Sequence, residues 1–440
     1  MIDDLQREID RLAGELGVPG AAVGIVDGDA EHALSTGIAS VRTGTPVTPD
    51  TLFQIGSTSK TVTATAAMRL VEDGALSLDT RVQEVLPGFR LGDPGALDAL
   101  RVRHLLTHSG GFLGDIDDTE DWGPGALSRS VHEDYAALPQ LFAPGTVASY
   151  SNSGIRLLGA IVAEVSDRVF EDAVQETVLD PLGMTESVYF PWDALLRPFA
   201  VGHVLTDDGP VVARSFGIYR ESAPEGGIVS SVRDQLRYLR FQLRGEAEGR
   251  PPVSDATRAL MQQPHIQAGP PLDGIGLPWL LRTHGGTRIV EHGGNIGNVQ
   301  LSTFALAPDL DLGVTVLTNS APGKELGTRV LNWCLEHLRG IVPATPAEVA
   351  PAADPDAVLG RYDLNHWQHI VTRQGDELLI ETELRPDLVA QGFPGMPPLR
   401  ARLGEDRVLR LADGKSVGRF LVTETGAEFL HIGLRAAARI

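Results

Sequence analysis

The sequence predicts a protein of two domains, a large α/β (α+β) domain followed by a small all-β domain. Three observations predict this fold class. The chain has 440 residues, more than one hydrophobic core usually organises. Within residues 1–341, strand-like runs at both ends enclose a helical middle. A segment rich in proline and alanine, 342–357, then separates these residues from alternating strand-like runs in 358–440, so we expect it to be a linker.

The first half of the large domain contains three recognisable patterns. Apolar residues recur every three or four positions between Ile2 and Leu12, which predicts an amphipathic helix. Two short apolar runs joined by turn residues predict a hairpin over 20–29 and 31–40. A helix should then run from about 58 to 73, because Gly74 offers a left-handed cap at its end.

The second half of this domain returns from helices to strands. Apolar stripes predict helices over 155–165 and 228–243. Strand patterns broken by turns follow between 287 and 320, and a helix over 325–338 closes the domain. Strands from both ends of the domain would then form one sheet with a helical region beside it. In the last domain, the turn sequences QGDE, ADGK and TETG separate short alternating strands.

The composition excludes several classes of function. Hydrophobic residues make up 42% of the chain and charged residues 22%, as in ordinary globular proteins. The net charge of −21 argues against nucleic acid and against an anionic membrane surface as partners. The single cysteine, Cys334, suits a reducing compartment. Since the N-terminal segment lacks the basic and apolar regions of a secretion signal, we expect a cytoplasmic protein.

One lysine stands in an unusual setting. Only three of the 37 basic residues are lysines, and one of them, Lys60, follows Ser57 by three positions among small apolar residues and threonines. On a helix the amine and the hydroxyl would share a face. Lysine, unlike arginine, can give up its proton when buried, so Lys60 is a candidate base. Gly56 would let another backbone approach. The alternative is that Ser57 only caps the helix while Lys60 extends to solvent.

Two further segments carry candidate site residues. In APGTVASYSNSG (143–154), Tyr150 and Asn152 directly precede a predicted helix. In VEHGGNIGN (290–298), His292 ends a strand and two glycines follow it. Each segment also has a purely structural interpretation. Asn152 would be a helix cap, Tyr150 a half-buried aromatic residue, and His292 a structural histidine before a plain turn.

Together these motifs resemble a known superfamily. S-x-x-K at 57–60, Y-x-N at 150–152 and H-x-G at 292–294 resemble the serine β-lactamases and penicillin-binding proteins. Their spacing is most similar to the class C branch, which includes esterases, D-amino-acid peptidases and transacylases. The resemblance covers roughly 5–340 and implies an antiparallel sheet flanked by helices, with an all-helical region. The last domain is similar to the lipocalin-like modules that follow some such domains.

The resemblance implies roles for the first two motifs. Ser57 would be the nucleophile and Lys60 its partner. Tyr150 would exchange protons with Ser57 and the leaving group, as a phenolate that the nearby ammonium favours. Asn152 would hold Lys60 and donate a hydrogen bond to the substrate.

The third motif would complete the site. The backbone N–H groups of Ser57 and Asn295 would form the oxyanion hole, and Gly293 and Gly294 would line the substrate. β-Lactamases usually carry lysine where His292 stands, so a largely neutral histidine favours ester or amide chemistry over antibiotic hydrolysis. If His292 lies near Tyr150, its ionisation should appear between about pH 5 and 8.

We therefore expect serine-dependent acyl transfer through an acyl-enzyme at Ser57. The acyl donor would be a small-molecule ester or amide, and the protein an esterase, an amidase or an amide-forming transacylase. The alternatives are a D-amino-acid peptidase or a β-lactamase and, in another class, a sensor that is acylated once without turnover. No cofactor or metal is expected, because no Cys/His cluster has the spacing of metal ligands.

Two features remain outside the motifs. The acidic loop 114–125 is either a solvated face or a site that attracts an amine acceptor through Asp115, Asp117 and Asp118. We favour the solvated face. His104 and His108 lie in RVRHLLTHSGGF (101–112), a segment that resembles a structural part of the family, so a packing role is expected for both.

Overall fold

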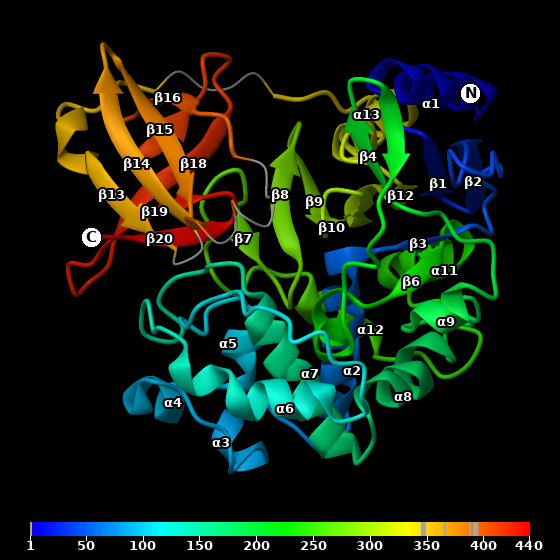
Figure 1. The fold of residues 1–440 in the computed structure, drawn as a ribbon, viewed down its shortest axis with the longest axis horizontal. Helices are drawn as coiled ribbons and strands as arrows, with labels where there is room; N and C mark the ends of the chain where they lie inside the picture. The colour runs from blue at the N-terminus through cyan, green and yellow to red at the C-terminus, as the bar shows by residue number, and fades with distance from the viewer. Residues whose placement is uncertain (1, 345–348, 365–366, 387–388, 390–394) are drawn as a thin grey trace.

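An antiparallel sheet assembled from both ends of the first domain forms its centre (Figure 1). The computed structural model describes residues 2–344, 349–364, 367–386, 389 and 395–440. The strand order is β2-β1-β12-β11-β9-β8-β7, and β10 pairs with β11. The strands are β1 (Gly20–Asp27), β2 (Ala30–Gly37), β7 (Gly274–Ile275), β8 (Leu280–His284), β9 (Thr287–Glu291), β10 (Gly294–Ile296), β11 (Gln300–Ala307) and β12 (Leu312–Thr318). The predicted single sheet from distant segments is confirmed.

Two terminal helices cover one face of this sheet. They are α1 (Ile2–Leu16) and α13 (Gly323–Arg339), which contact each other as well as the strands. Leu5, Ile9 and Leu12 of α1 are buried in the core beneath them, which confirms the amphipathic pattern. On the opposite face, α11 (Val232–Arg244) packs against β1 and β12.

The remaining helices form the helical region below the sheet in Figure 1. Its centre is α2 (Ser59–Glu72), which is buried on every side from residue 59 to residue 68 and packs against α7 (Asn152–Ser166). Around this pair lie α3 (Val82–Val85), α4 (Pro94–Ala99), α5 (Val102–Leu106), α6 (Ala126–Glu133), α8 (Phe170–Val174), α9 (Pro191–Ala194), α10 (Ala223–Gly226) and α12 (Asp255–Met261). None of the helices in the described residues is long and apolar enough to cross a membrane.

The C-terminal strands close into a barrel, drawn in orange and red in Figure 1. They are β13 (Gly360–Asp363), β14 (Trp367–Gln374), β15 (Glu377–Leu384), β16 (Leu399–Leu403), β17 (Val408–Arg410), β18 (Ser416–Val422), β19 (Glu428–Ile432) and β20 (Arg435–Arg439). The predicted α/β domain followed by an all-β domain is thus confirmed. Within the expected linker, residues 345–348 lie outside the described part, and a 3₁₀ turn (Pro355–Val358) precedes β13.

Three local details differ from the expected elements. Ser57 lies in a 3₁₀ turn (Gly56–Thr58) that leads into α2, rather than in the α-helix itself. The N-cap of α7 is Ser151, whose hydroxyl accepts from the Gly154 N–H, so Asn152 is the first helical residue. The segment before α11 forms a short strand, β6 (Val229–Ser231), which pairs with β3 (Leu52–Gln54). A separate hairpin joins β4 (His203–Thr206) and β5 (Gly209–Val212).

Candidate active site

The 3₁₀ turn brings the hydroxyl of Ser57 against the amine of Lys60. Lys60 Nζ donates to Ser57 Oγ at 3.0 Å and to the backbone carbonyl of Glu225 at 2.6 Å. The Lys60 side chain is buried, and this burial lowers its pKa to about 7. A lysine with this pKa is substantially neutral at physiological pH, so Lys60 can accept the Ser57 proton.

A close approach of two backbones places Asn295 beside this turn. Gly56 has a φ of +52°, and a Cβ at this position would lie 2.8 Å from the Asn295 nitrogen. A Cβ on Gly294 would lie 1.9 Å from the Ile55 carbonyl oxygen. Only glycines fit here, and their contact places the backbone of Asn295 against the turn that carries Ser57. The two proposed oxyanion donors therefore lie on touching segments.

Tyr150 lies next to Lys60 and two histidines. Lys60 Nζ is 5.2 Å from the centroid of the Tyr150 ring, and the centroids of His108 and His292 are 4.6 and 5.9 Å away. Burial raises the pKa of Tyr150, although a hydrogen bond with Ser57 and the charge of Arg435 oppose this rise. The expectation that Tyr150 is a phenolate is therefore wrong, because the cost of removing the phenolate from water exceeds the stabilisation that Ser57 and Arg435 provide.

His292 is a neutral histidine in this structure. Its ring is buried, and Nδ1 lies 2.9 Å from the Gly293 carbonyl oxygen. Since a carbonyl only accepts, Nδ1 carries the proton and Nε2 carries the lone pair. Burial, together with the positive charge of Lys60, lowers the pKa of His292 to about 3. The expectation that His292 ionises between pH 5 and 8 is therefore wrong.

Asn152 has a different partner from the expected one. Its Nδ2 donates to Asp115 Oδ1 at 2.7 Å, whereas Lys60 pairs with Ser57 and the Glu225 carbonyl. A carboxylate only accepts, so Asp115 orients the amide with Nδ2 toward itself. Sequence reasoning assigned Asp115 to a surface loop and missed this contact.

His108 packs against the same aromatic ring. Its buried side chain accepts a hydrogen bond on Nδ1 from the Ser151 N–H at 3.2 Å, next to Tyr150. Burial lowers the pKa of His108 well below its usual value, so the ring is neutral. His104 lies further away, where its Nδ1 accepts from the Arg101 N–H at the start of α5.

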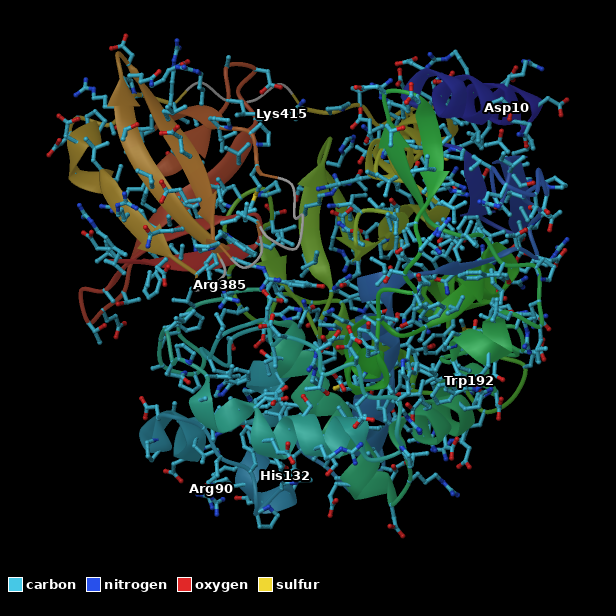
Figure 2. All side chains as sticks on the ribbon, in the orientation of Figure 1. Asp10, Arg90, His132, Trp192, Arg385 and Lys415 are labelled. Atoms are coloured by element: carbon cyan, nitrogen blue, oxygen red, sulfur yellow. The ribbon has the colours of Figure 1, made fainter. Side chains whose placement is uncertain are left out.

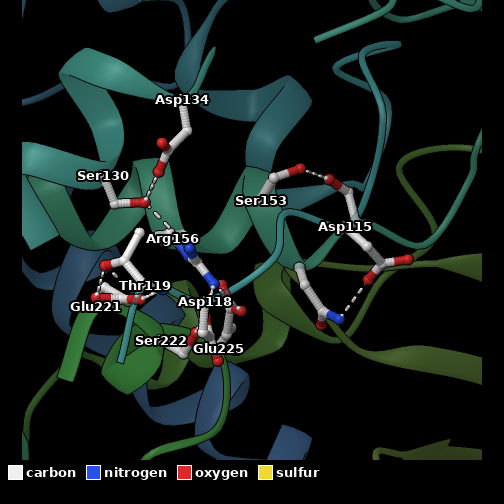
Figure 3. Close-up of polar contacts among 12 residues, drawn as sticks. Asp115, Asp118, Thr119, Ser130, Asp134, Ser153, Arg156, Glu221, Ser222 and Glu225 are labelled. Carbon is white, nitrogen blue, oxygen red and sulfur yellow. Dashed lines mark hydrogen bonds and ion pairs between the residues drawn. The ribbon is translucent and has the colours of Figure 1, made fainter. Parts of the chain in front are cut away.

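A buried arginine anchors the acidic loop. Arg156 NH2 donates to Asp118 Oδ1 at 2.7 Å and to Glu225 Oε1 at 3.0 Å (Figure 3). Asp118 Oδ1 also accepts from Ser222 Oγ. The backbone carbonyl of Glu225 accepts a hydrogen bond from Lys60. By holding the Glu225 side chain, this network therefore also fixes the position of that carbonyl. Arg156 was missed, although a lone arginine inside the apolar stripe of α7 was its signal.

Two other acidic residues of the loop, Asp115 and Asp117, face the barrel. Asp115 forms an ion pair with Arg435, with NH1 and Oδ2 2.7 Å apart. Asp117 is more exposed, and its Oδ2 lies 3.9 Å from NH2 of Arg385, which is labelled in Figure 2. The interpretation of the loop as a solvated face is therefore wrong for Asp115 and Asp118, which arginines neutralise. Nothing local in the sequence marks Arg435 as the partner of Asp115.

Comparisons with known proteins identify the family of this chain. The β-lactamase family model matches residues 5–332. Penicillin-binding protein 4 of Amycolatopsis lactamdurans is 34% identical over 363 residues, which are 80% of this chain and 93% of that protein. This similarity confirms the resemblance drawn from the three motifs.

Solved structures are similar as well. The crystal structure of SurE covers 100% of this chain, barrel included, and 98% of its own, with a TM-score of 0.80 and 28% identity. A second structure, of SurE with D-Leu, has a TM-score of 0.76 and 27% identity, and covers 100% and 99% of the two chains. A class C β-lactamase from Rhodobacter sphaeroides covers 74% of this chain and 98% of its own, with a TM-score of 0.62 and 27% identity. The expected class C-like fold is confirmed.

Proposed function

The chain belongs to the β-lactamase family, and we propose that it transfers an acyl group through an ester formed on Ser57. The observation that carries this proposal is the 3.0 Å hydrogen bond from Lys60 Nζ to Ser57 Oγ, made by a buried amine whose pKa is lowered to about 7. A solvent-exposed lysine would remain protonated and could not act as the base.

The chemical steps follow from the contacts. Neutral Lys60 takes the proton of Ser57 as Oγ attacks the carbonyl carbon of the donor. The backbone N–H groups of Ser57 and Asn295 stabilise the oxyanion. As the tetrahedral intermediate collapses, the phenol of Tyr150 protonates the leaving group and is reprotonated from the Lys60 ammonium. An incoming nucleophile then loses a proton along the same path in reverse and releases the acyl group.

We propose a small ester or amide as the acyl donor. Among these, derivatives of D-amino acids are the first candidates to test. SurE, whose structure spans the whole of this chain, was solved with D-Leu, which supports testing D-aminoacyl donors here. A neutral His292 provides no fixed cation for the carboxylate of a β-lactam, which supports ester or amide donors over antibiotics.

Transfer to an amine is the finer part of this proposal. The barrel packs directly on the loop that carries Tyr150, where the Tyr150 N–H donates to the Leu434 carbonyl. A wall on this side restricts the approach of water, which favours a second nucleophile bound beside the ester. The acidic loop contributes less than expected, since Asp115 and Asp118 are already paired with arginines.

The test combines labelling with product analysis. Ser57→Ala should abolish labelling by a fluorophosphonate and all turnover, whereas Ser128→Ala, at an exposed serine, should change neither. With D- and L-aminoacyl esters as donors and a series of primary amines, mass spectrometry should detect amide that increases with amine concentration. Acid alone at every amine concentration would leave hydrolysis as the function. Product limited to one equivalent per protein would indicate a sensor, and turnover by Ser57→Ala would refute the proposal.

A further inference from the structure

The hairpin between β19 and β20 of the barrel is built into the loop that carries Tyr150. The Tyr150 N–H donates to the carbonyl of Leu434 at 2.9 Å, and the Ala436 N–H donates to Ser149 Oγ at 3.1 Å. Leu434 itself has a φ of +72°, an uncommon conformation for a residue with a branched side chain. The tip of the hairpin thus adopts a strained turn where it contacts the loop.

The residue after Leu434 extends from this tip into the site. Arg435 NH1 donates to the Tyr150 carbonyl at 2.9 Å, and the guanidinium binds Asp115 through both terminal nitrogens, at 2.7 and 3.0 Å. Its Cζ lies 5.4 Å from the centroid of the Tyr150 ring. The same oxygen of Asp115 that accepts from Arg435 NH2 also accepts from Asn152 Nδ2. Arg435 therefore contacts Tyr150 directly and reaches Asn152 through Asp115.

We propose that Arg435 is a positioning residue for acyl transfer, which acts through Asp115 on the Asn152 amide and through the backbone on Tyr150. This inference rests on the proposed function, because it gives both residues a part in the reaction. A bidentate guanidinium restricts the carboxylate to one orientation. Without it, Asp115 is released to turn, and the Asn152 amide loses the partner that fixes its direction. The barrel is then a working part of the acyl-transfer site.

The same ion pair balances the charge near Lys60. Burial is the largest influence on the pKa of Lys60, while Glu225 and Asp115 raise this pKa and Arg435 and Arg156 lower it. The other titratable groups around the amine are His108, His292 and Tyr150. Because burial keeps both histidines neutral and Tyr150 a phenol, removal of Arg435 should raise the pKa of Lys60, and removal of the Asp115 charge should lower it.

The experiment uses the full-length protein and five variants. These are Arg435→Ala, Arg435→Lys, Asp115→Asn, the double variant Arg435→Ala/Asp115→Asn, and Arg402→Ala as the control. Arg402 is an exposed arginine of the same barrel, and its nearest acidic partner, Glu377, is 3.8 Å away. For each variant, kcat, KM and the pH profile of kcat/KM are measured with one ester donor, and the rate of fluorophosphonate labelling is measured in parallel.

The expected results separate positioning from simple packing. Arg435→Ala should lower kcat at pH 7 at least tenfold and move the rising limb of the profile to higher pH. Asp115→Asn should lower kcat and move this limb to lower pH. Arg435→Lys should restore the position of the limb but only part of kcat, because lysine keeps the charge without the bidentate geometry. In the double variant the limb should return toward its original position while kcat stays low.

Other results would overturn the inference. The inference is refuted if Arg435→Ala has the same kinetics as the control Arg402→Ala. It is also refuted if the rising limb of the pH profile moves in the same direction in Arg435→Ala and in Asp115→Asn. If Arg435→Ala fails to fold, Arg435→Lys and Asp115→Asn decide by the same two criteria. Failure of the proposed function itself is distinct, because Ser57→Ala would then remain active whatever happens at Arg435.

Discussion

Replacement of Lys60 by methionine should stabilise the protein at neutral pH and destabilise it at high pH. Burial lowers the pKa of Lys60 from 10.5 to about 7, so the folded state binds fewer protons than the unfolded state between these values. The stability cost of the buried amine is complete below about pH 7 and disappears above about pH 10.5. At pH 7 it amounts to about 4 kcal/mol, at roughly 1.4 kcal/mol for each pH unit.

The loss of two hydrogen bonds opposes the stability that is gained when the buried amine is removed. Methionine cannot donate to Ser57 Oγ or to the Glu225 carbonyl, as Lys60 does. Their loss should cost about 1–3 kcal/mol together, since a typical intramolecular hydrogen bond contributes roughly 0.5–1.5 kcal/mol. The free energy of unfolding of Lys60→Met should therefore exceed that of the parent by about 1–3 kcal/mol at pH 7. It should fall below that of the parent by a similar amount near pH 10.5, with no net difference at about pH 9.

Urea denaturation between pH 6.5 and 10 measures this difference. Tryptophan fluorescence, to which the fully buried Trp279 contributes, follows unfolding of the large domain. Lys324→Met is the matched control, because Lys324 is exposed and its replacement should give no such dependence on pH. The reasoning is refuted if Lys60→Met is less stable than the parent at every pH, or if the difference between them is constant across the range. Turnover by Lys60→Met should be undetectable throughout, since the base is gone.

Three further changes test other parts of the site. Gly56→Ala should lower kcat at least 100-fold, because its Cβ would lie 2.8 Å from the Asn295 nitrogen and displace an oxyanion donor; a kcat within threefold of the parent contradicts this. His292→Asn should reduce kcat but leave the pH profile of kcat/KM unchanged between pH 5 and 8, because the buried histidine is neutral there; loss of a limb would show that it titrates. Arg156→Met should lower the free energy of unfolding at pH 7 by about 3–5 kcal/mol in urea, because Glu225 keeps a buried charge without its partner; a change below 1 kcal/mol would mean that the ion pair contributes little.

Much of the fold followed from local patterns. The spacing of apolar residues in α1 and the alternation in the barrel strands were sufficient, because each pattern reports which face of one element is buried. The 3₁₀ turn at Ser57 was not predictable in this way. It depends on the backbone of β10, about 240 residues later, which contacts Gly56.

The candidate site was predictable as a set of residues but not as a set of protonation states. Ser57, Lys60, Tyr150 and His292 lie together, as the three motifs indicated. For Lys60 the expected direction of the pKa agrees with the structure, because its own neighbours in α2 already bury it. For Tyr150 and His292 the expectation was wrong. Desolvation by residues from several distant segments raises the pKa of Tyr150 more than Ser57 and Arg435 lower it, and for His292 desolvation and the charge of Lys60 both lower the pKa.

The sequence by itself determined the family, the fold class and the residue types of the acyl-transfer chemistry, because these depend on motifs and periodicities that are contained in short segments. Only the tertiary structure decided how those residues are paired. Asn152 faces Asp115 because Arg435, 320 positions beyond that aspartate, holds the carboxylate from another domain. A hydrogen-bond partner depends on distances between side chains in space, and no spacing along the chain encodes a contact between segments that lie 320 positions apart.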